Sequence, residues 1–301
     1  MKPTLIIGST VADIIISVGH IPKTGEDVNV EAQSAAPGGC AFNVSEILRL
    51  SGLPYFLLSP VGTGIYGDFV KRELSKRDIV PAIQVTDMDN GCCYCLVEPD
   101  GERTFLCDHG AEYFFKPDWL AALDANEFDG VFLCGIEIEE TTGGVIIDWL
   151  ETYPGLPVFF APGPRIHLID PEKIKRILAF SPLLHLNETE ALTFTRTETV
   201  EEAAEQLYCM ARNSVIITLS EKGAFCLDAQ KPDGQRVFHS PGFPARIVNT
   251  IGAGDSHMGA VIAGLKQGKT LEEAVARANL IASKVVSVKE ATLSPDVFNS
   301  L

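Results

Sequence analysis

The chain has 301 residues, 46% of them hydrophobic and 21% charged, which is the composition of a soluble globular protein with one large α/β domain or two smaller ones. A formal net charge of −16 argues against a general role on nucleic acid or on an anionic membrane. The first 16 residues lack the uninterrupted apolar region of a signal peptide, and no apolar run approaches the roughly 18 residues of a membrane span. We therefore expect a cytoplasmic protein.

Apolar runs of strand length alternate with helical patterns along most of the chain. Near-continuous apolar strands separated by helices are typical of a mostly parallel sheet that helices cover on both faces. The strands are expected at 4–9, 55–62, 131–137, 157–162, 183–187 and 214–220, with helices at 40–52, 67–78 and 171–180.

Two segments interrupt this alternation. Residues 14–37 and 83–113 contain short strands with alternating polar residues and turn signals, including the hairpin sequence Glu98-Pro-Asp-Gly101. We expect them to form a small antiparallel β lid. The α/β core then comprises residues 1–13, 38–82 and 114–301.

The C-terminal third has the clearest helical pattern. Met258, Val261, Ile262 and Leu265 share one face of a helix that follows Asp255 and ends near Gly268. The Thr-x-x-Glu spacing of the segment 270–273 is a capping box, which predicts the start of a second helix.

Eight cysteines without an export signal are expected to be reduced thiols. One cluster could supply zinc ligands, but it contains no paired Cys-x-x-Cys, and the segment 91–98 reads as a strand whose cysteines act as small hydrophobes. The cluster consists of Cys92, Cys93, Cys95, Cys107 and His109.

Two glycine-rich segments resemble phosphate loops. Gly62 to Gly67 fits Gly-x-Gly-x-x-Gly after a strand, with Asp87 twenty residues beyond Gly67, and is the basis for an alternative reading as an NAD-dependent oxidoreductase. Asp87 stands in a turn-rich stretch, so a tight turn is the simpler interpretation. Residues 264–270 resemble a Walker A loop with one residue too few, and we expect a turn between helices there.

The segment Gly252-Ala-Gly-Asp255 opens the predicted C-terminal helix. Unpaired N–H groups of Gly252, Ala253 and Gly254, together with the helix dipole, would form an anion site that a phosphate can approach closely. A carboxylate at Asp255 would repel that phosphate, unless it takes a proton from a hydroxyl that attacks phosphorus. Taken alone, the segment leaves open whether Asp255 is a base or only a helix cap.

A second glycine-rich element, Pro37-Gly-Gly-Cys-Ala-Phe-Asn43, also leads into a helix. Its glycines, Gly38 and Gly39, permit close approach of a ligand, and the Asn43 amide offers a donor and an acceptor to hydroxyl groups.

Five elements in this order resemble the ribokinase/PfkB family of carbohydrate and nucleoside kinases. The resemblance covers essentially the whole chain and implies a ribokinase-like three-layer α/β/α sandwich with a mostly parallel central sheet and a β lid, which often forms a homodimer contact. The elements are Gly8-Ser-Thr-Val-Ala-Asp13, Gly38-Gly39 with Asn43, Asn187-Glu-Thr-Glu190, Thr218-Leu-Ser-Glu-Lys-Gly223, and Thr250 to Asp255.

The resemblance implies transfer of the ATP γ-phosphate to a hydroxyl of a sugar or sugar-like substrate. Asp255 would be the base, and amides of Gly252, Ala253 and Gly254 would stabilise charge on the phosphoryl group. The acceptor would contact Asp13, Gly38, Gly39, Asn43 and, as a weaker assignment at the end of the strand 131–137, Glu137. The nucleotide would contact Asn187, Thr218, Ser220, Gly223 and Asn279, while Glu190 would hold Mg²⁺ through water.

The chain departs from the family pattern at two positions. Asn249 replaces a common Asp near the monovalent-cation site, which leaves K⁺ activation open, and Gly64 stands where Asp is frequent. His257 is read as a helix residue and not as a catalyst. A nucleoside kinase and a non-catalytic sugar sensor on the same fold are the further alternatives, and an intact Asp255 argues against the sensor.

Overall fold

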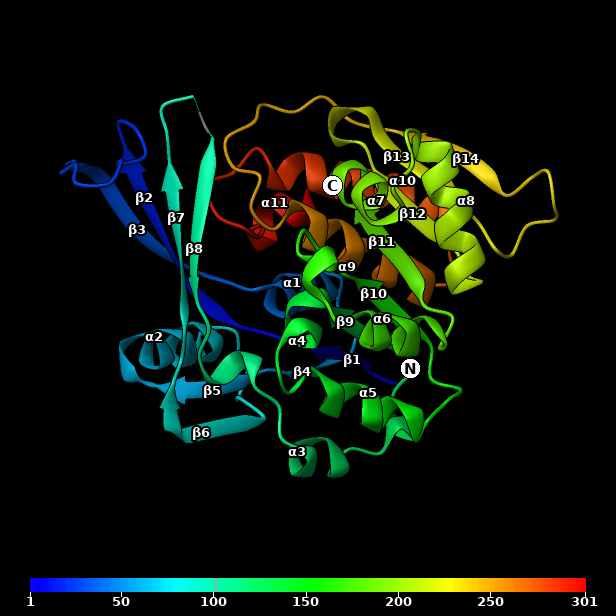
Figure 1. Ribbon diagram of the computed structural model, residues 1–301, viewed down its shortest axis with the longest axis horizontal. Coiled ribbons are helices and arrows are strands. Elements are labelled where there is room, and N and C mark those ends of the chain that lie inside the picture. The colour runs from blue at the N-terminus through cyan, green and yellow to red at the C-terminus, as the bar shows by residue number, and fades with distance from the viewer. Residues whose placement is uncertain (101) are drawn as a thin grey trace.

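The computed structural model describes residues 1–100 and 102–301. Among these residues, eight strands form the main sheet in the order β14-β13-β12-β11-β10-β9-β1-β4, with helices on both faces (Figure 1). This is the expected three-layer arrangement. The strands are β1 (Thr4–Ile7), β4 (Tyr55–Leu58), β9 (Val131–Cys134), β10 (Val158–Ala161), β11 (Leu183–Asn187), β12 (Val215–Thr218), β13 (Gly223–Leu227) and β14 (Val237–Pro241).

The sheet is parallel from β4 to β12 and antiparallel at the edge formed by β13 and β14. All four residues of β1 and of β9 are buried, as expected for strands covered on both faces. Successive side chains point to opposite faces, so Leu133 joins one core cluster and Phe132 the other.

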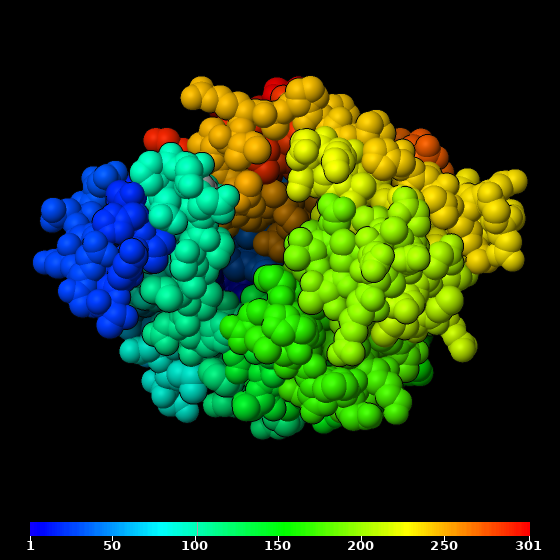
Figure 2. Space-filling model, turned by 45° about the horizontal axis from the view of Figure 1, so that its top comes forward, coloured from blue at the N-terminus to red at the C-terminus, as the bar shows by residue number. Residues whose placement is uncertain are grey.

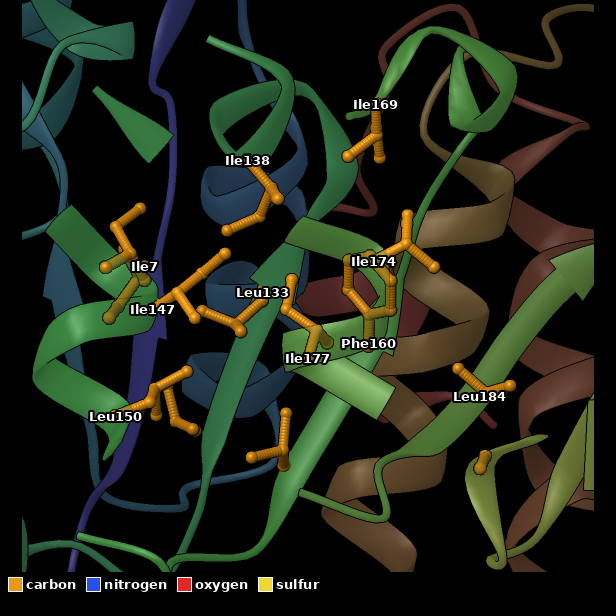
Figure 3. Close-up of a cluster of buried hydrophobic side chains, with 14 of the residues drawn as sticks. Ile7, Leu133, Ile138, Ile147, Leu150, Phe160, Ile169, Ile174, Ile177 and Leu184 are labelled. Atoms are coloured by element: carbon orange, nitrogen blue, oxygen red, sulfur yellow. The ribbon is translucent and has the colours of Figure 1, made fainter. Parts of the chain in front are cut away.

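Two sets of helices cover the two faces. The core on one face, with Ile7, Leu133 and Phe160 at its centre, packs against Ile147 and the helices around it (Figure 3). That set is α4 (Gly135–Glu139), α5 (Gly143–Glu151), α6 (Pro171–Leu178), α7 (Glu188–Thr195) and α8 (Val200–Ala211); the other is α1 (Cys40–Leu50), α2 (Gly64–Ser75), α9 (Ala253–Lys266) and α10 (Leu271–Val285).

Short elements complete the chain. Two helices, α3 (Pro117–Ala121) and α11 (Pro295–Asn299), each begin with Pro at a position where its missing N–H is not needed. Single 3₁₀ turns are η1 (Ala111–Tyr113), η2 (Ala125–Glu127), η3 (Ile166–Leu168) and η4 (Ser220–Lys222). Across residues 1–100 and 102–301, none of the helices has the length and apolar character needed to span a bilayer.

The expected lid is a separate sheet beside the core, with strand order β3-β2-β7-β8 (Figure 1). Its two outer pairs are antiparallel, but the central pair, β2 with β7, is parallel. Part of the segment 83–113 lies elsewhere, because β6 (Ile83–Asp89) pairs with β5 (Pro60–Thr63). Gly101 of the expected hairpin turn lies outside the described residues. The lid strands are β2 (Val11–Val18), β3 (Val30–Gly38), β7 (Cys92–Val97) and β8 (Arg103–Asp108).

Three sequence-based assignments need correction. The expected strand 55–62 is two strands, β4 and β5. The expected strand 131–137 ends at Cys134, and Glu137 lies in α4, because the chain turns at Gly135, where a Cβ would lie only 1.8 Å from the carbonyl oxygen of Pro162. Asp13 was expected in the core segment 1–13, but it is the third residue of β2 and therefore part of the lid sheet.

The two C-terminal helices agree with expectation. Thr270 Oγ1 accepts a hydrogen bond of 3.2 Å from the Glu273 N–H, and Glu273 Oε2 accepts one of 2.9 Å from the Thr270 N–H. This capping box starts α10. The Walker-like segment 264–270 is the end of α9 and the turn into α10, so it is not a phosphate loop.

Candidate active site

A hollow lies between the lid and the core. Figure 2 shows it bordered by the lid strands on one side, with parts of the N-terminal segment and of the segment around residues 250–265 in its depth. The two predicted glycine-rich elements, 252–255 and 37–43, lie at this hollow and are described next.

The first element is the N-terminus of α9. Gly252 is the residue before the helix and has a φ of 72°, and a Cβ there would lie 2.5 Å from the carbonyl oxygen of Ala291. A Cβ at Gly254, in contrast, would meet no atom within 4 Å, so the helix end is open on that side. The Ala253 N–H has a long contact of 3.4 Å with the Thr250 carbonyl. Free N–H groups and the helix dipole suit this end to an anion.

Asp255 lies in the first turn of α9 and is held by Asn43 from the second glycine-rich element. Asn43 Nδ2 donates a 2.9 Å hydrogen bond to Asp255 Oδ2, although the two residues are 212 positions apart. Burial raises the pKa of Asp255 to about 6, against the lowering effect of hydrogen bonds from Asn43 and Cys40. A carboxylate with this pKa is still charged at neutral pH, and it is a stronger base than an exposed Asp.

The second element places Asp13 against the backbone of the chain. A Cβ at Gly38 would lie 2.0 Å from Asp13 Oδ2, and one at Gly39 (φ 98°) would lie 2.5 Å from the carbonyl oxygen of Ser9. Burial is the main cause that raises the pKa of Asp13 to about 7, followed by the nearby Cys107 and Asp255. Only glycines allow this approach of carboxylate and backbone.

Several buried polar atoms in this region have no hydrogen-bond partner in the protein. Glu137 Oε1 accepts a 2.8 Å bond from the Ser9 N–H, but Oε2 accepts none, and burial raises the pKa of this carboxyl to about 7. Unpaired buried polar atoms are costly, so they indicate that a polar ligand completes them. The unpaired atoms here are Ser9 Oγ, Thr10 Oγ1, Asn43 Oδ1 and Glu137 Oε2.

Ser9 and Thr10 were not among the residues predicted from the sequence. They stand between the strand β1 and Asp13, inside the element Gly8 to Asp13 that carried the resemblance. Both are fully buried. Their position within that element is the feature of the sequence from which they could have been predicted as site residues.

Asn187 and Glu190 interlock at the start of α7. Glu190 Oε1 and Oε2 accept bonds of 2.8 and 3.0 Å from Asn187 Nδ2 and N–H, and Asn187 Oδ1 accepts one of 2.8 Å from the Glu190 N–H. Burial raises the pKa of Glu190, and repulsion from Asp255 adds to the effect. Glu190 therefore lies close enough to Asp255 for the two carboxylates to repel each other.

Thr218, Ser220 and Gly223 form the tight connection from β12 to β13. Ser220 has a φ of 54°, which is the left-handed region, and Gly223 has a φ of 96°. A Cβ at Gly223 would lie 2.1 Å from the carbonyl oxygen of Ser240. The turn is thus fixed by close backbone packing, and Thr218 Oγ1 only weakly contacts the Leu186 carbonyl at 3.4 Å.

The structure places Asn279 in a buried network. Its Nδ2 donates to Ser240 and Pro241, and its Oδ1 is 3.0 Å from His257 Nε2. His257 in turn is 2.9 Å from His185 Nε2. His257 therefore has a structural role, as expected, while the contact between Asn279 and the nucleotide stays a prediction.

Arg103 joins the lid to the loop before α9 and was missed by the sequence analysis. It donates bonds of 3.0 Å to Thr250 Oγ1 and 3.2 Å to the Val248 carbonyl. Asn249 fixes the same loop, because its Nδ2 donates to the Lys289 carbonyl and its Oδ1 accepts a 2.8 Å bond from the Ile251 N–H. An amide serves both contacts, whereas a carboxylate could not donate.

The dinucleotide alternative fails at its glycines. A Cβ at Gly62 would lie 2.5 Å from the Asn90 N, and one at Gly67 would lie 2.3 Å from the Gly62 carbonyl oxygen. These glycines serve packing of the chain on itself and leave no room for a pyrophosphate. Asp87 lies in the strand β6 and not in a turn, so that part of the sequence argument was wrong. At Gly64, the Asp89 carboxylate from β6 fills the space that a Cβ would take.

No group of three or more His, Cys, Asp or Glu side chains suited to a metal ion occurs in the described part of the chain, and all eight cysteines are free.

A carboxylate beside an open helix N-terminus, with unpaired polar atoms nearby, is an arrangement that suits a small-molecule phosphotransferase on an α/β fold. The family model of pfkB family carbohydrate kinases matches residues 1–297. The uncharacterized sugar kinase YegV of Escherichia coli (strain K12) is 33% identical over 300 residues, which cover 98% of this chain and 91% of that protein.

Solved structures show the same fold. The ribokinase from Thermotoga maritima superposes with a TM-score of 0.84 at 23% identity, covering 100% of this chain and 99% of that one. Arabidopsis thaliana ribokinase, in complex with ribose and ATP, gives a TM-score of 0.78 at 21% identity, covering 99% and 98%. The chain belongs to the pfkB family of carbohydrate kinases.

Proposed function

We propose that the protein transfers the γ-phosphate of ATP to a hydroxyl of a sugar or sugar-like substrate, with Asp255 as the general base. The observation that supports this most directly is the position of the Asp255 carboxylate, in the first turn of α9 and hydrogen-bonded to Asn43. A base beside an anion site is of use only to a reaction that brings a hydroxyl and a phosphoryl group together.

In this proposal the acceptor is held by Asp13, Asn43 and Glu137, and the unpaired Asn43 Oδ1 and Glu137 Oε2 accept hydrogen bonds from its hydroxyl groups. The acceptor hydroxyl gives its proton to Asp255 as its oxygen bonds to phosphorus. Amides of Gly252, Ala253 and Gly254 stabilise the charge on the phosphoryl oxygens.

The nucleotide end consists of Asn187, Thr218, Ser220, Gly223 and Asn279. Asn187 and Glu190 suit Mg²⁺ held through water, because an amide and a carboxylate are oxygen ligands and Glu190 is repelled by Asp255, which a divalent cation would relieve. When bound, Mg²⁺ supplies positive charge that neutralises the ATP phosphates.

The test is a screen of pentoses, hexoses, their acids and nucleosides for ADP release that depends on the acceptor, with the product identified by mass. A sugar acceptor is expected. Phosphorylation of nucleosides only would favour the alternative of a nucleoside kinase, and ATP hydrolysis indifferent to every acceptor would contradict the proposal.

Replacement of Gly38 by Ala is expected to raise the KM for the acceptor at least about tenfold, because the new Cβ would displace the Asp13 carboxylate from its position 2.0 Å away. The KM for ATP should stay unchanged. Gly144→Ala is the matched control, since a Cβ at that helical position meets nothing within 4 Å. Steady-state kinetics with each substrate varied in turn would measure both values, and an equal rise in the two KM values would contradict the assignment.

We also propose a homodimer through the lid, whose strands expose apolar side chains at Val30, Phe105 and Leu106. Sedimentation velocity, with Leu106→Lys as the disrupting variant, would measure this state.

A further inference from the structure

Two thiols face one another on the lid. Cys93 of β7 and Cys107 of β8 are directly opposed in the strand register, and their Sγ atoms are 3.5 Å apart. Cys93 is also opposite Asp13 on the neighbouring strand β2. Opposed residues of paired strands have Cβ atoms about 4.5 to 5.5 Å apart, close to the separation that a disulfide needs. A small movement of the two side chains would bring their sulfur atoms to bonding distance.

Charged groups around the pair favour a thiolate at Cys107. Hydrogen bonds from Cys93 and from His109 lower the pKa of the Cys107 thiol to about 5. The hydrogen bond between His109 and Cys107 raises the pKa of His109 to about 9, and a hydrogen bond with Glu140 adds to this effect. His109 Nδ1 lies 2.5 Å from Glu140 Oε1, and its ring stacks on Tyr113 at 4.0 Å. At neutral pH this gives a thiolate beside an imidazolium whose position is fixed.

The two cysteines also differ in exposure. Cys107 is exposed, so a small oxidant can reach it, whereas Cys93 is partly buried. The hydrogen bond with Cys107 raises the pKa of Cys93, so Cys93 stays protonated. Other lid thiols lack this arrangement; burial, for example, raises the pKa of Cys95 to about 11. Reactive cysteines are exposed, have a low pKa and stand next to a second thiol, and this pair has all three properties.

We propose that Cys107 and Cys93 form a peroxide-reactive dithiol site, with Cys107 as the attacking thiolate and Cys93 as the resolving thiol. The Cys107 sulfur attacks one oxygen of a hydroperoxide, the O–O bond breaks, and the departing oxygen takes a proton from His109 and leaves as an alcohol or water. The product is a sulfenic acid at Cys107. The Cys93 sulfur then bonds to the Cys107 sulfur, and the hydroxyl leaves as water with the Cys93 proton. Two thiols lose two electrons and two protons, and the hydroperoxide gains them.

The disulfide would change the acceptor end of the site. It replaces an anionic sulfur near Asp13 by a neutral one, and it cross-links two strands of the lid. Because the chemistry needs neither ATP nor a sugar, it can be tested independently of the kinase reaction.

The experiment treats the full-length reduced protein at pH 7 with hydrogen peroxide and follows its intact mass. The expected result is loss of the mass of two hydrogen atoms, restored by dithiothreitol. Tryptic cleavage after Arg103 separates the two cysteines, so the disulfide should join the peptides on either side. Cys107→Ser should not lose this mass, and Cys93→Ser should gain oxygen atoms instead. The exposed Cys209 on α8 gives the control, because Cys209→Ser should behave as the unmodified protein.

A second measurement guards against variants that fold poorly. The rate of alkylation of Cys107 by iodoacetamide against pH gives its pKa in the unmodified protein, and His109→Gln should slow reaction at pH 7 at least about fivefold. Gain of oxygen without loss of hydrogen in the unmodified protein would overturn the proposal. Formation of the same disulfide mass in Cys107→Ser would overturn it too.

Discussion

Replacement of Asp255 by Asn is expected to lower kcat by at least about a hundredfold, because an amide cannot take the proton of the attacking hydroxyl. Binding of ATP and of the acceptor should persist, since the Asn oxygen can still accept the 2.9 Å bond that Asn43 Nδ2 donates to Asp255. Single-turnover assays and equilibrium binding would measure the two effects separately. Undiminished turnover would show that Asp255 is not the base.

The same variant should be more stable than the unmodified protein at pH 8. The pKa of Asp255 is raised from 3.8 to about 6 in the folded state, so the folded protein binds the proton more tightly, and the cost of the buried charge is full above pH 6 and absent below about 4. We expect a gain of roughly 1 to 3 kcal/mol in unfolding free energy at pH 8, which shrinks toward pH 4. Asp118→Asn, at an exposed position in α3, is the control. It should change neither kcat nor the free energy of unfolding at pH 8.

The raised pKa also sets the pH dependence of the unmodified enzyme. A base must be deprotonated, so kcat/KM should fall as pH decreases through about 6, with a loss of at least about tenfold for each further unit. The profile of kcat/KM against pH would measure this, because kcat/KM reports the pKa values of the free enzyme. A profile flat from pH 8 to pH 5 would argue for a different proton acceptor.

Local patterns predicted the α9 end of the site well. The helical period of the residues after Asp255 and the glycines before it both act over a few neighbouring residues, so these patterns predicted where the helix begins. The parallel sheet was predicted for the same reason, because buried strands such as β1 and β9 are apolar throughout.

Contacts between distant segments were beyond the sequence. Arg103 reaches Thr250 across 147 positions, and only the packing of the lid over the core brings them together. The strand that carries Asp13 could not be assigned to the lid from sequence, because a strand's partners depend on register and not on its own pattern. The pairing of His185 with His257 is hidden in the same way, since each lies in an apolar segment and neither has a motif.

That pair has a defined arrangement of protons. Asn279 Nδ2 donates to Ser240 and Pro241, so its Oδ1 is the acceptor and His257 Nε2 must carry a proton. His257 Nδ1 then accepts from His185 Nε2 at 2.9 Å. Burial lowers the pKa of both rings, to about 4 for His257, and a second proton on His257 would face the N–H of His185. Both histidines are therefore neutral donors and acceptors in the core.

His257→Leu is accordingly expected to lower the free energy of unfolding at pH 8 by roughly 2 to 5 kcal/mol, because it leaves the Asn279 carbonyl and the His185 N–H buried without partners. His257 has a folded pKa of about 4 against 6.5 as its ordinary value, so its contribution is complete above pH 6.5 and is lost as the pH falls toward 4. The difference between the two proteins should thus shrink by about 3 kcal/mol over that interval. Urea unfolding from pH 8 to pH 4 measures it, with exposed His239→Leu as the control, for which we expect a change below about 0.5 kcal/mol at pH 8. A stability difference that does not vary with pH would mean that His257 is not held neutral by this network.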